Sequence, residues 1–150
     1  MIIRKASFND IDDIYYWRND SLSRSMSVDK TTVSIIEHKN WLKSSLINPN
    51  IKLYIGIKEG KKVGLIRFDF DKHNNKAEVS INLNPSMRGK RLSFDFLSTS
   101  ISIYLNNKKV KLTATIKKKN LASLKIFEKC GFLKNNEDSI FQYLFYSQKY

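Results

Sequence analysis

Cysteine is almost absent from this chain of 150 residues, and long hydrophobic runs are absent altogether. With Cys130 alone, the chain can form neither an internal disulfide nor a multi-cysteine metal site. The apolar run over residues 140–144 is interrupted by Gln142 and is far shorter than the roughly 20 residues of a membrane-spanning helix. The two histidines, His38 and His73, are far apart in sequence and indicate no metal site. No secretory signal is recognisable, so we expect a cytoplasmic protein without metal or membrane span.

Acidic residues are also scarce, because 14 Asp and Glu stand against 27 Lys and Arg, a net charge of +13. Most of the excess lies in residues 88–134, which hold 12 basic and 2 acidic side chains. Such a segment predicts an anionic partner: nucleic acid, a membrane surface or a phosphorylated small molecule. A solvated lysine-rich surface would give the same composition, so charge alone does not choose among these.

The residues that are present describe one globular domain over 1–150, with 41% hydrophobic and 12% aromatic residues and no repeat. In the first half we predict a short strand near residues 2–4, a helix from Asn9-Asp10 to about residue 18, and a polar connector over 21–29. A second helix is predicted from Thr31 or Thr32 to about residue 46. Its buried face would be made by Val33, Ile36, Trp41 and Leu42.

The middle and the end of the chain alternate between strand and helix patterns. Residues 52–58 and 63–71 flank a Glu59-Gly60 turn and predict a hairpin, and 76–83 continues as a third strand. Beyond them we predict helices over 92–105 and 120–129, a strand over 110–116, and final strands at Phe132 and 140–146. This order predicts an α/β domain in which helices cover both faces of one mixed sheet.

A basic loop connects the third of these strands to the helix that follows. Backbone N–H groups of such a loop and of the first helical turn can converge on an anion, helped by the helix dipole. The segment reads Arg88-Gly89-Lys90-Arg91-Leu92-Ser93. By itself it is compatible with a phosphate site and with ordinary basic surface.

A second segment makes the pattern specific: Asn120-x-x-Ser123-x-x-x-Phe127-x-x-x-Gly131-Phe132. Together with Asn84-Pro85 and the basic loop, it resembles the signature segments of the GNAT superfamily of acyl-CoA N-acetyltransferases, over nearly the whole chain. The resemblance implies a twisted mixed sheet of six to seven strands flanked by about four helices. It also implies that this sheet splays apart between its fourth and fifth strands.

The resemblance further implies that acetyl-CoA is the acyl donor and that no metal takes part. The backbone near residues 81–83 would pair with the pantetheine arm, the loop would hold the pyrophosphate, and Phe127 would pack beside the thioester. The residues implied to contact the donor are Ile81, Leu83, Arg88, Gly89, Lys90, Arg91, Leu92, Ser93, Asn120, Ser123 and Phe127.

Three positions depart from the family pattern. Arg91 and Ser93 stand where relatives usually have glycine, and the Arg91 side chain could either crowd the pyrophosphate or add a charge to it. Phe127 stands where many relatives have a tyrosine thought to protonate the leaving thiolate. That tyrosine role therefore does not carry over to this chain.

For the base that deprotonates the acceptor, the resemblance points to Glu78 on the fourth strand. Ser80, on the same face, could relay the proton, and Tyr143 could replace the missing acid. The alternatives are an exposed Glu78 paired with Lys76, an ordinary polar Ser80, and a Tyr143 that only packs.

Three segments bear on the identity of the acceptor: Trp17-Arg18-Asn19-Asp20, Arg24-x-Met26 and Glu37-His38-x-x-Trp41. These segments resemble the GNAT branch that acetylates nucleotide-linked deoxyamino sugars, as in pseudaminic and legionaminic acid pathways. Relatives that modify protein N-termini also carry the Trp-Arg-Asn element. The predicted substrate-binding residues are Trp17, Arg18, Arg24 and Met26, with anchoring of the helix to the sheet as the alternative for Trp17.

The leading hypothesis is therefore transfer of acetyl from acetyl-CoA to a small-molecule amine that is linked to a nucleotide. A protein α-amine or a polyamine is the alternative acceptor. A non-catalytic CoA-binding or basic nucleic-acid-binding module is the alternative of another class, although the chain has no aromatic–basic RNA-reading motif. A homodimer is compatible with every one of these readings.

Overall fold

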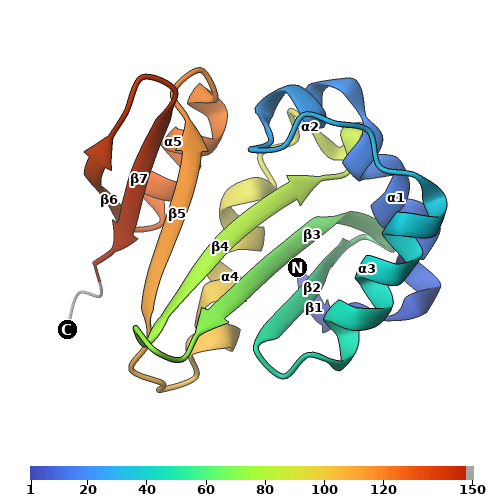
Figure 1. Ribbon diagram of the computed structural model, residues 1–150, viewed down its shortest axis with the longest axis horizontal. Helices are drawn as coiled ribbons and strands as arrows, with labels where there is room; N and C mark the ends of the chain where they lie inside the picture. The colour runs from blue at the N-terminus through green and yellow to red at the C-terminus, as the bar shows by residue number, and fades with distance from the viewer. Residues whose placement is uncertain (148–150) are drawn as a thin grey trace.

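The computed structural model describes residues 1–147, and its centre is a single seven-stranded sheet (Figure 1). The strand order is β1-β2-β3-β4-β5-β7-β6, and every neighbouring pair is antiparallel except β4 with β5. The strands are β1 (Ile2–Lys5), β2 (Ile51–Lys58), β3 (Lys61–Asp71), β4 (Lys76–Leu83), β5 (Lys111–Lys117), β6 (Phe132–Glu137) and β7 (Phe141–Tyr146). The predicted mixed α/β fold is confirmed.

Five α-helices flank this sheet in the described part of the chain, one more than predicted. They are α1 (Ile11–Asn19), α2 (Ser21–Met26), α3 (Ile35–Ile47), α4 (Ser93–Leu105) and α5 (Leu121–Lys129), with 3-10 turns at Phe8–Asp10 and Pro85–Met87. The additional helix is α2, which occupies the segment predicted as a polar connector. It forms because the Asp20 carboxylate accepts a hydrogen bond from the Ser23 N–H (3.0 Å) and so caps its first turn.

The sheet splits between β4 and β5. These strands pair only where Lys76–Glu78 lie beside Lys111–Thr113, after which they diverge (Figure 1). Strand β4 stays paired with β3 as far as Leu83, and β5 stays paired with β7. The splay predicted between the fourth and fifth strands is therefore present.

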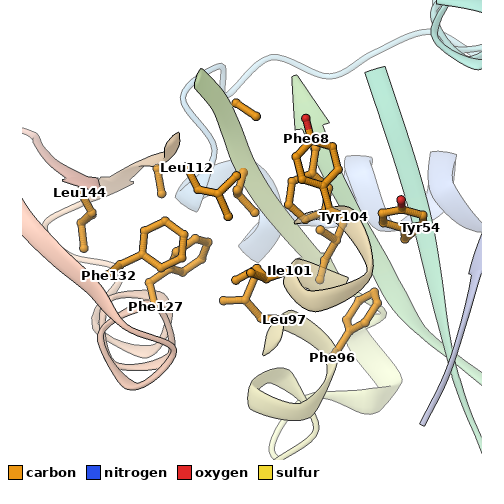
Figure 2. Packing of buried hydrophobic residues seen from close by; sticks show 14 of the residues in the cluster. Tyr54, Phe68, Phe96, Leu97, Ile101, Tyr104, Leu112, Phe127, Phe132 and Leu144 are labelled. Atoms are coloured by element: carbon orange, nitrogen blue, oxygen red, sulfur yellow. The ribbon is translucent and has the colours of Figure 1, made fainter. Parts of the chain in front are cut away.

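Two hydrophobic clusters hold the helices on opposite faces of the sheet. On one face α1 and α3 pack through Ile14, Trp17 and Leu42 onto Ile55 and neighbouring residues of β2 and β3. On the other face α4 and α5 cover a larger core that continues behind the splay, from Phe68 of β3 to Leu112 of β5 and Leu144 of β7 (Figure 2). In that core the rings of Tyr104 and Phe68 stack 4.1 Å apart.

Helix α3 differs from its prediction in both start and orientation. It begins at Ile35 because Ser34 and Glu37 form a reciprocal capping box. Its buried residues are His38, Leu42 and Ser45, at the spacing of one helical face, whereas Ile36 is 70% exposed. The predicted face containing Ile36 is wrong, and the correct face turns a histidine inward.

Candidate active site

A cleft of about 910 Å³ opens where the sheet splays. Its walls come from α1, α2, α3, the cleft-facing side of β3 and β4, the loop after β4, and the start of α5. Segments from both halves of the sheet therefore meet around one cavity, which is large enough for a small organic ligand.

Helix α2 bridges the splay and forms one wall of this cleft. On the β4 side, the Ser23 hydroxyl donates to the Asn82 side-chain oxygen (3.0 Å), and Arg88 forms an ion pair with Asp20 (2.5 Å). On the β5 side, the Lys117 ammonium donates to the Ser25 carbonyl (3.0 Å). Lys117 is only 3% exposed, and its desolvation, with the charges of nearby lysines, lowers its pKa. The short helix is thus tied to both sides of the opening.

The edge of β4 that faces the splay offers free backbone groups. The Asn84 N–H donates to the Val63 carbonyl (2.8 Å), which fixes the alternation of the antiparallel β3–β4 pair. Ser80 and Asn82 then direct their backbone groups toward β3, and Ile81 and Leu83 direct theirs toward the open side. An extended ligand with amide groups can pair there, which supports the prediction for Ile81 and Leu83.

The loop before α4 has the backbone conformation and the free donors that an anion site requires. Gly89 and Arg91 have φ values of 74° and 58°, and Leu92 caps α4 without a side-chain hydrogen bond. Among residues 1–147, none of the seven backbone N–H groups from 89 to 95 has a backbone acceptor. Seven neighbouring donors at the positive end of a 13-residue helix favour a diphosphate.

The backbone conformation of Arg91 suits a position where relatives usually have glycine. Its backbone takes the left-handed conformation that glycine adopts easily, so the path of the loop is kept, and its side chain is exposed. Gly89, Ser93, Asn120 and Ser123 line the cleft, with the Asn120 side chain accepting from the Ser123 N–H (3.2 Å). Lys90, Arg91 and Leu92 do not line it.

Two residues implied to hold the donor have other contacts. The Arg88 guanidinium forms an ion pair with Asp20 and donates to the Ser23 hydroxyl (2.8 Å), so it anchors α2. Phe127 is 2% exposed and packs edge-on against Phe132, with ring centroids 4.9 Å apart, in the core behind the cleft (Figure 2). The expectation that Phe127 lies beside the thioester is corrected, because its ring fills space that the core needs.

Glu78 stands on the cleft wall as an unpaired carboxylate. Glu78, Ser80 and Asn82 alternate along β4 and line the cleft. Of the alternative for Glu78, the exposed position is present, but the pair with Lys76 is not formed, and Glu78 has no ion pair within residues 1–147. Desolvation by surrounding protein atoms raises the pKa of Glu78, and the charge of Asp69 raises it further, although the open cleft leaves the carboxylate accessible to water. Such a carboxylate is suited to accept a proton.

The end of the cleft that α1 and α3 line holds two buried polar groups, one on the predicted substrate-binding residue Arg18 and one on His38, to which the sequence analysis assigned no individual role. The Nε2 atom of His38 and the Nη1 atom of Arg18 are buried there, and neither has a hydrogen-bond partner among residues 1–147. Burial lowers the pKa of His38, and the charge of Arg18 lowers it further, so the imidazole is neutral at pH 7. Trp41 lies beside His38, with ring centroids 5.2 Å apart. The His-x-x-Trp spacing, one helical turn, was the available signal.

The other predicted acceptor and catalytic residues are distributed as follows. Arg18 and Met26 line the cleft. Trp17 is 2% exposed within the core, so its predicted substrate contact is corrected to the alternative of anchoring α1 to the sheet. Arg24 donates to the Asn19 carbonyl (3.2 Å) outside the cleft lining, and Tyr143 donates to the Asp138 carboxylate (2.7 Å), also outside it. Their positions give the roles predicted for Arg24 and Tyr143 no support.

Comparison with known proteins agrees with this geometry. The model of the acetyltransferase (GNAT) domain family matches residues 1–133, so the chain belongs to that family. The spermidine N-acetyltransferase from Vibrio cholerae, solved with CoA and spermine, has a TM-score of 0.86 at 14% identity, covering 96% of this chain and 93% of that one. A putative phosphinothricin N-acetyltransferase has a TM-score of 0.81 at 25% identity, covering 97% and 96%. No protein of curated function matches the sequence significantly.

The family and the site together make the chain an acetyl-CoA-dependent N-acetyltransferase. Within residues 1–147, no cluster of side chains is suited to hold a metal ion. None of the helices in that range is long and apolar enough to cross a membrane.

Proposed function

We propose that the enzyme acetylates a primary amine that also carries an anionic group, and that a nucleotide-linked deoxyamino sugar is this acceptor. Its acetyl donor is acetyl-CoA, bound with its diphosphate at residues 89–95 and its pantetheine arm along the open edge of β4. Glu78 is the general base, and Arg18 binds the anionic part of the acceptor.

The observation that carries this proposal is the balance of charges at the acceptor end of the cleft. Asp69 forms an ion pair with Arg67. Among residues 1–147, the Arg18 guanidinium and the carboxylates of Glu37 and Glu78 form no ion pair, although Glu37 accepts from the Ser34 N–H (3.3 Å) and Arg18 donates to the Asp29 carbonyl (3.2 Å). A guanidinium in a cleft that also holds free carboxylates complements an acceptor that carries both an ammonium and a phosphate or carboxylate.

The proposed groups account for each proton moved and for each bond formed or broken in the transfer. Glu78 removes one proton from the acceptor ammonium, directly or through the Ser80 hydroxyl, and the freed amine forms a bond to the thioester carbonyl carbon. A backbone N–H at Ile81 or Leu83 stabilises the charge on the carbonyl oxygen. When the carbon–sulfur bond breaks, the second ammonium proton passes to the CoA sulfur. This transfer needs no tyrosine at position 127.

A polyamine acceptor is the second candidate, and two observations favour it. A structural neighbour was solved with spermine, and three carboxylates, Glu37, Asp69 and Glu78, line the cleft of this chain. A polycation would have to displace Arg67 from Asp69 and lie close to Arg18. The two candidates therefore make opposite predictions for removal of the Arg18 charge.

The test is CoA release with a panel of acceptors: UDP- and dTDP-linked amino sugars, the matched free amino sugars, phosphinothricin and spermidine. We expect the nucleotide-linked amines to react and the free sugars to react poorly. In Arg18→Met we expect the KM for the anionic acceptors to rise about tenfold or more, because a charge-assisted hydrogen bond is lost. Acetylation of spermidine that improves in Arg18→Met, with no nucleotide-linked amine accepted, would replace the first candidate by the second.

A further inference from the structure

A second carboxylate lies next to the proposed base, on the neighbouring strand. In the register of the β3–β4 pair, Asp69 lies directly opposite Glu78, and both side chains line the cleft. Directly opposite side chains on one face of a sheet are close neighbours, and like charges in this arrangement repel each other. Every ionisation of Glu78 therefore takes place next to an existing negative charge.

The position of Asp69 is fixed by Arg67, two residues earlier on the same face of β3. The Arg67 Nη2 donates to one carboxylate oxygen of Asp69 (2.8 Å), and Nε lies 2.7 Å from the other. The guanidinium also lies over the Trp41 ring, 5.5 Å from its centroid. The contact with α3, the single hydrogen bond from Nη2 and the ion pair hold Arg67 and Asp69 in place beside Glu78.

Glu78 and Asp69 also border a second, smaller cavity of about 300 Å³. It lies where β4 and β5 are still paired, and its lining includes Asp71, Lys76 and Thr113. Because Glu78 borders both cavities, the smaller one offers its proton a second route to solvent. The reaction releases one proton per acetyl group transferred, so Glu78 must lose that proton once in every cycle.

We propose that Asp69 and Arg67 are positioning residues that set the basicity of Glu78 with opposite sign, Asp69 strengthening it and Arg67 weakening it. The proposal rests on the proposed role of Glu78 as the base. Charged and titratable groups near Glu78 come from every element around it: Lys76 on β4; Arg67, Asp69 and Asp71 on β3; Arg18 on α1; Glu37 and His38 on α3.

The electrostatics agree with this assignment. Desolvation by surrounding protein atoms is the largest cause that raises the pKa of Glu78, which still borders the open cleft, followed by the charge of Asp69, while the charges of Arg67 and Lys76 act in the opposite direction. Removal of Asp69 also leaves Arg67 without its partner, so the substitution Asp69→Asn has two effects of the same sign on Glu78.

The experiment is the pH dependence of kcat/KM in Asp69→Asn, Arg67→Gln and the parent enzyme, with Glu59→Gln in the β2–β3 turn as a control for loss of a distant charge. Because the base acts when deprotonated, a lower basicity extends activity to lower pH. We expect the acidic limb to move down by about one pH unit in Asp69→Asn and up in Arg67→Gln. It should stay in place in Glu59→Gln.

Shifts of opposite sign cannot come from a general loss of structure, which would lower kcat/KM at all pH values. Limbs that stay in place in both variants, or move in the same direction, would overturn the proposal. Glu78→Gln separates this failure from failure of the proposed function. If the acidic limb persists in Glu78→Gln, Glu78 is not the base; if it disappears while Asp69→Asn shows no shift, only the role of Asp69 and Arg67 is lost.

Discussion

The two ends of the cleft are built from different parts of the chain. The proposed donor end offers backbone groups: the N–H groups of residues 89–95, the helix dipole of α4 and the open edge of β4. The proposed acceptor end offers side chains from separate elements: Arg18 of α1, His38 of α3, and Arg67 and Glu78 of the sheet. A backbone site depends on local chain geometry and tolerates many side chains, whereas a side-chain site changes with each substitution. This difference between backbone and side-chain sites explains how members of one fold can bind the same acyl donor and different acceptors.

The largest effect should come from the acceptor end. Glu78→Gln removes the proton acceptor without changing the size of the side chain, so kcat/KM at pH 7.5 should fall on the order of 100- to 1000-fold. Because the pKa of Glu78 is raised, the acidic limb of the parent enzyme should lie above the ordinary glutamate value of about 4.3. Steady-state kinetics and acetyl-CoA calorimetry measure both, and weakened acetyl-CoA binding in this variant would contradict the separation of the two ends.

A smaller effect should come from the donor end, where conformation is expected to outweigh charge. Arg91→Val and Arg91→Gly lose the same charge, but only valine resists the left-handed conformation at this position. In Arg91→Val we expect the KM for acetyl-CoA to rise about tenfold, because a displaced loop would lose about one hydrogen bond from a backbone N–H to the charged diphosphate. In Arg91→Gly we expect the KM to change little. Equal increases in the two variants would show that the Arg91 side chain, and not the loop conformation, binds the diphosphate.

The smallest effect should come from the bridge that joins the two ends. Lys117→Met removes the hydrogen bond to the Ser25 carbonyl and keeps the side-chain length, so α2 should loosen from β5. A loss of about 1 kcal/mol corresponds to roughly a fivefold rise in KM, expected for donor and acceptor alike. Lys119→Met, an exposed neighbour of the same charge, should change neither KM. A rise confined to one substrate would mean that α2 serves only that end.

The same difference explains how far the sequence could predict this molecule. The loop at 88–93 was predictable because consecutive residues determine the backbone conformation there, whereas the splay was predicted only through the resemblance to the family. Arg67 and Asp69 were missed, and His38 and Trp41 were named only as part of a segment that resembles one branch of the family, because α3 and β3 bring these side chains together only after they have packed. The burial of Trp17 was predictable, because Ile11, Ile14 and Trp17 repeat every three residues and so share the buried face of α1.

The open side of β4 is an unpaired strand edge, a feature that invites association between protein chains when it lies on a surface. Here α2 spans the opening beside this edge and is tethered to Asn82, Arg88 and Lys117. We expect a helix in this place to hinder the approach of a second polypeptide strand, whose side chains project from both faces, more than that of a thin, flexible molecule. The helix that shapes the cleft would thereby also limit edge-to-edge association of protein chains.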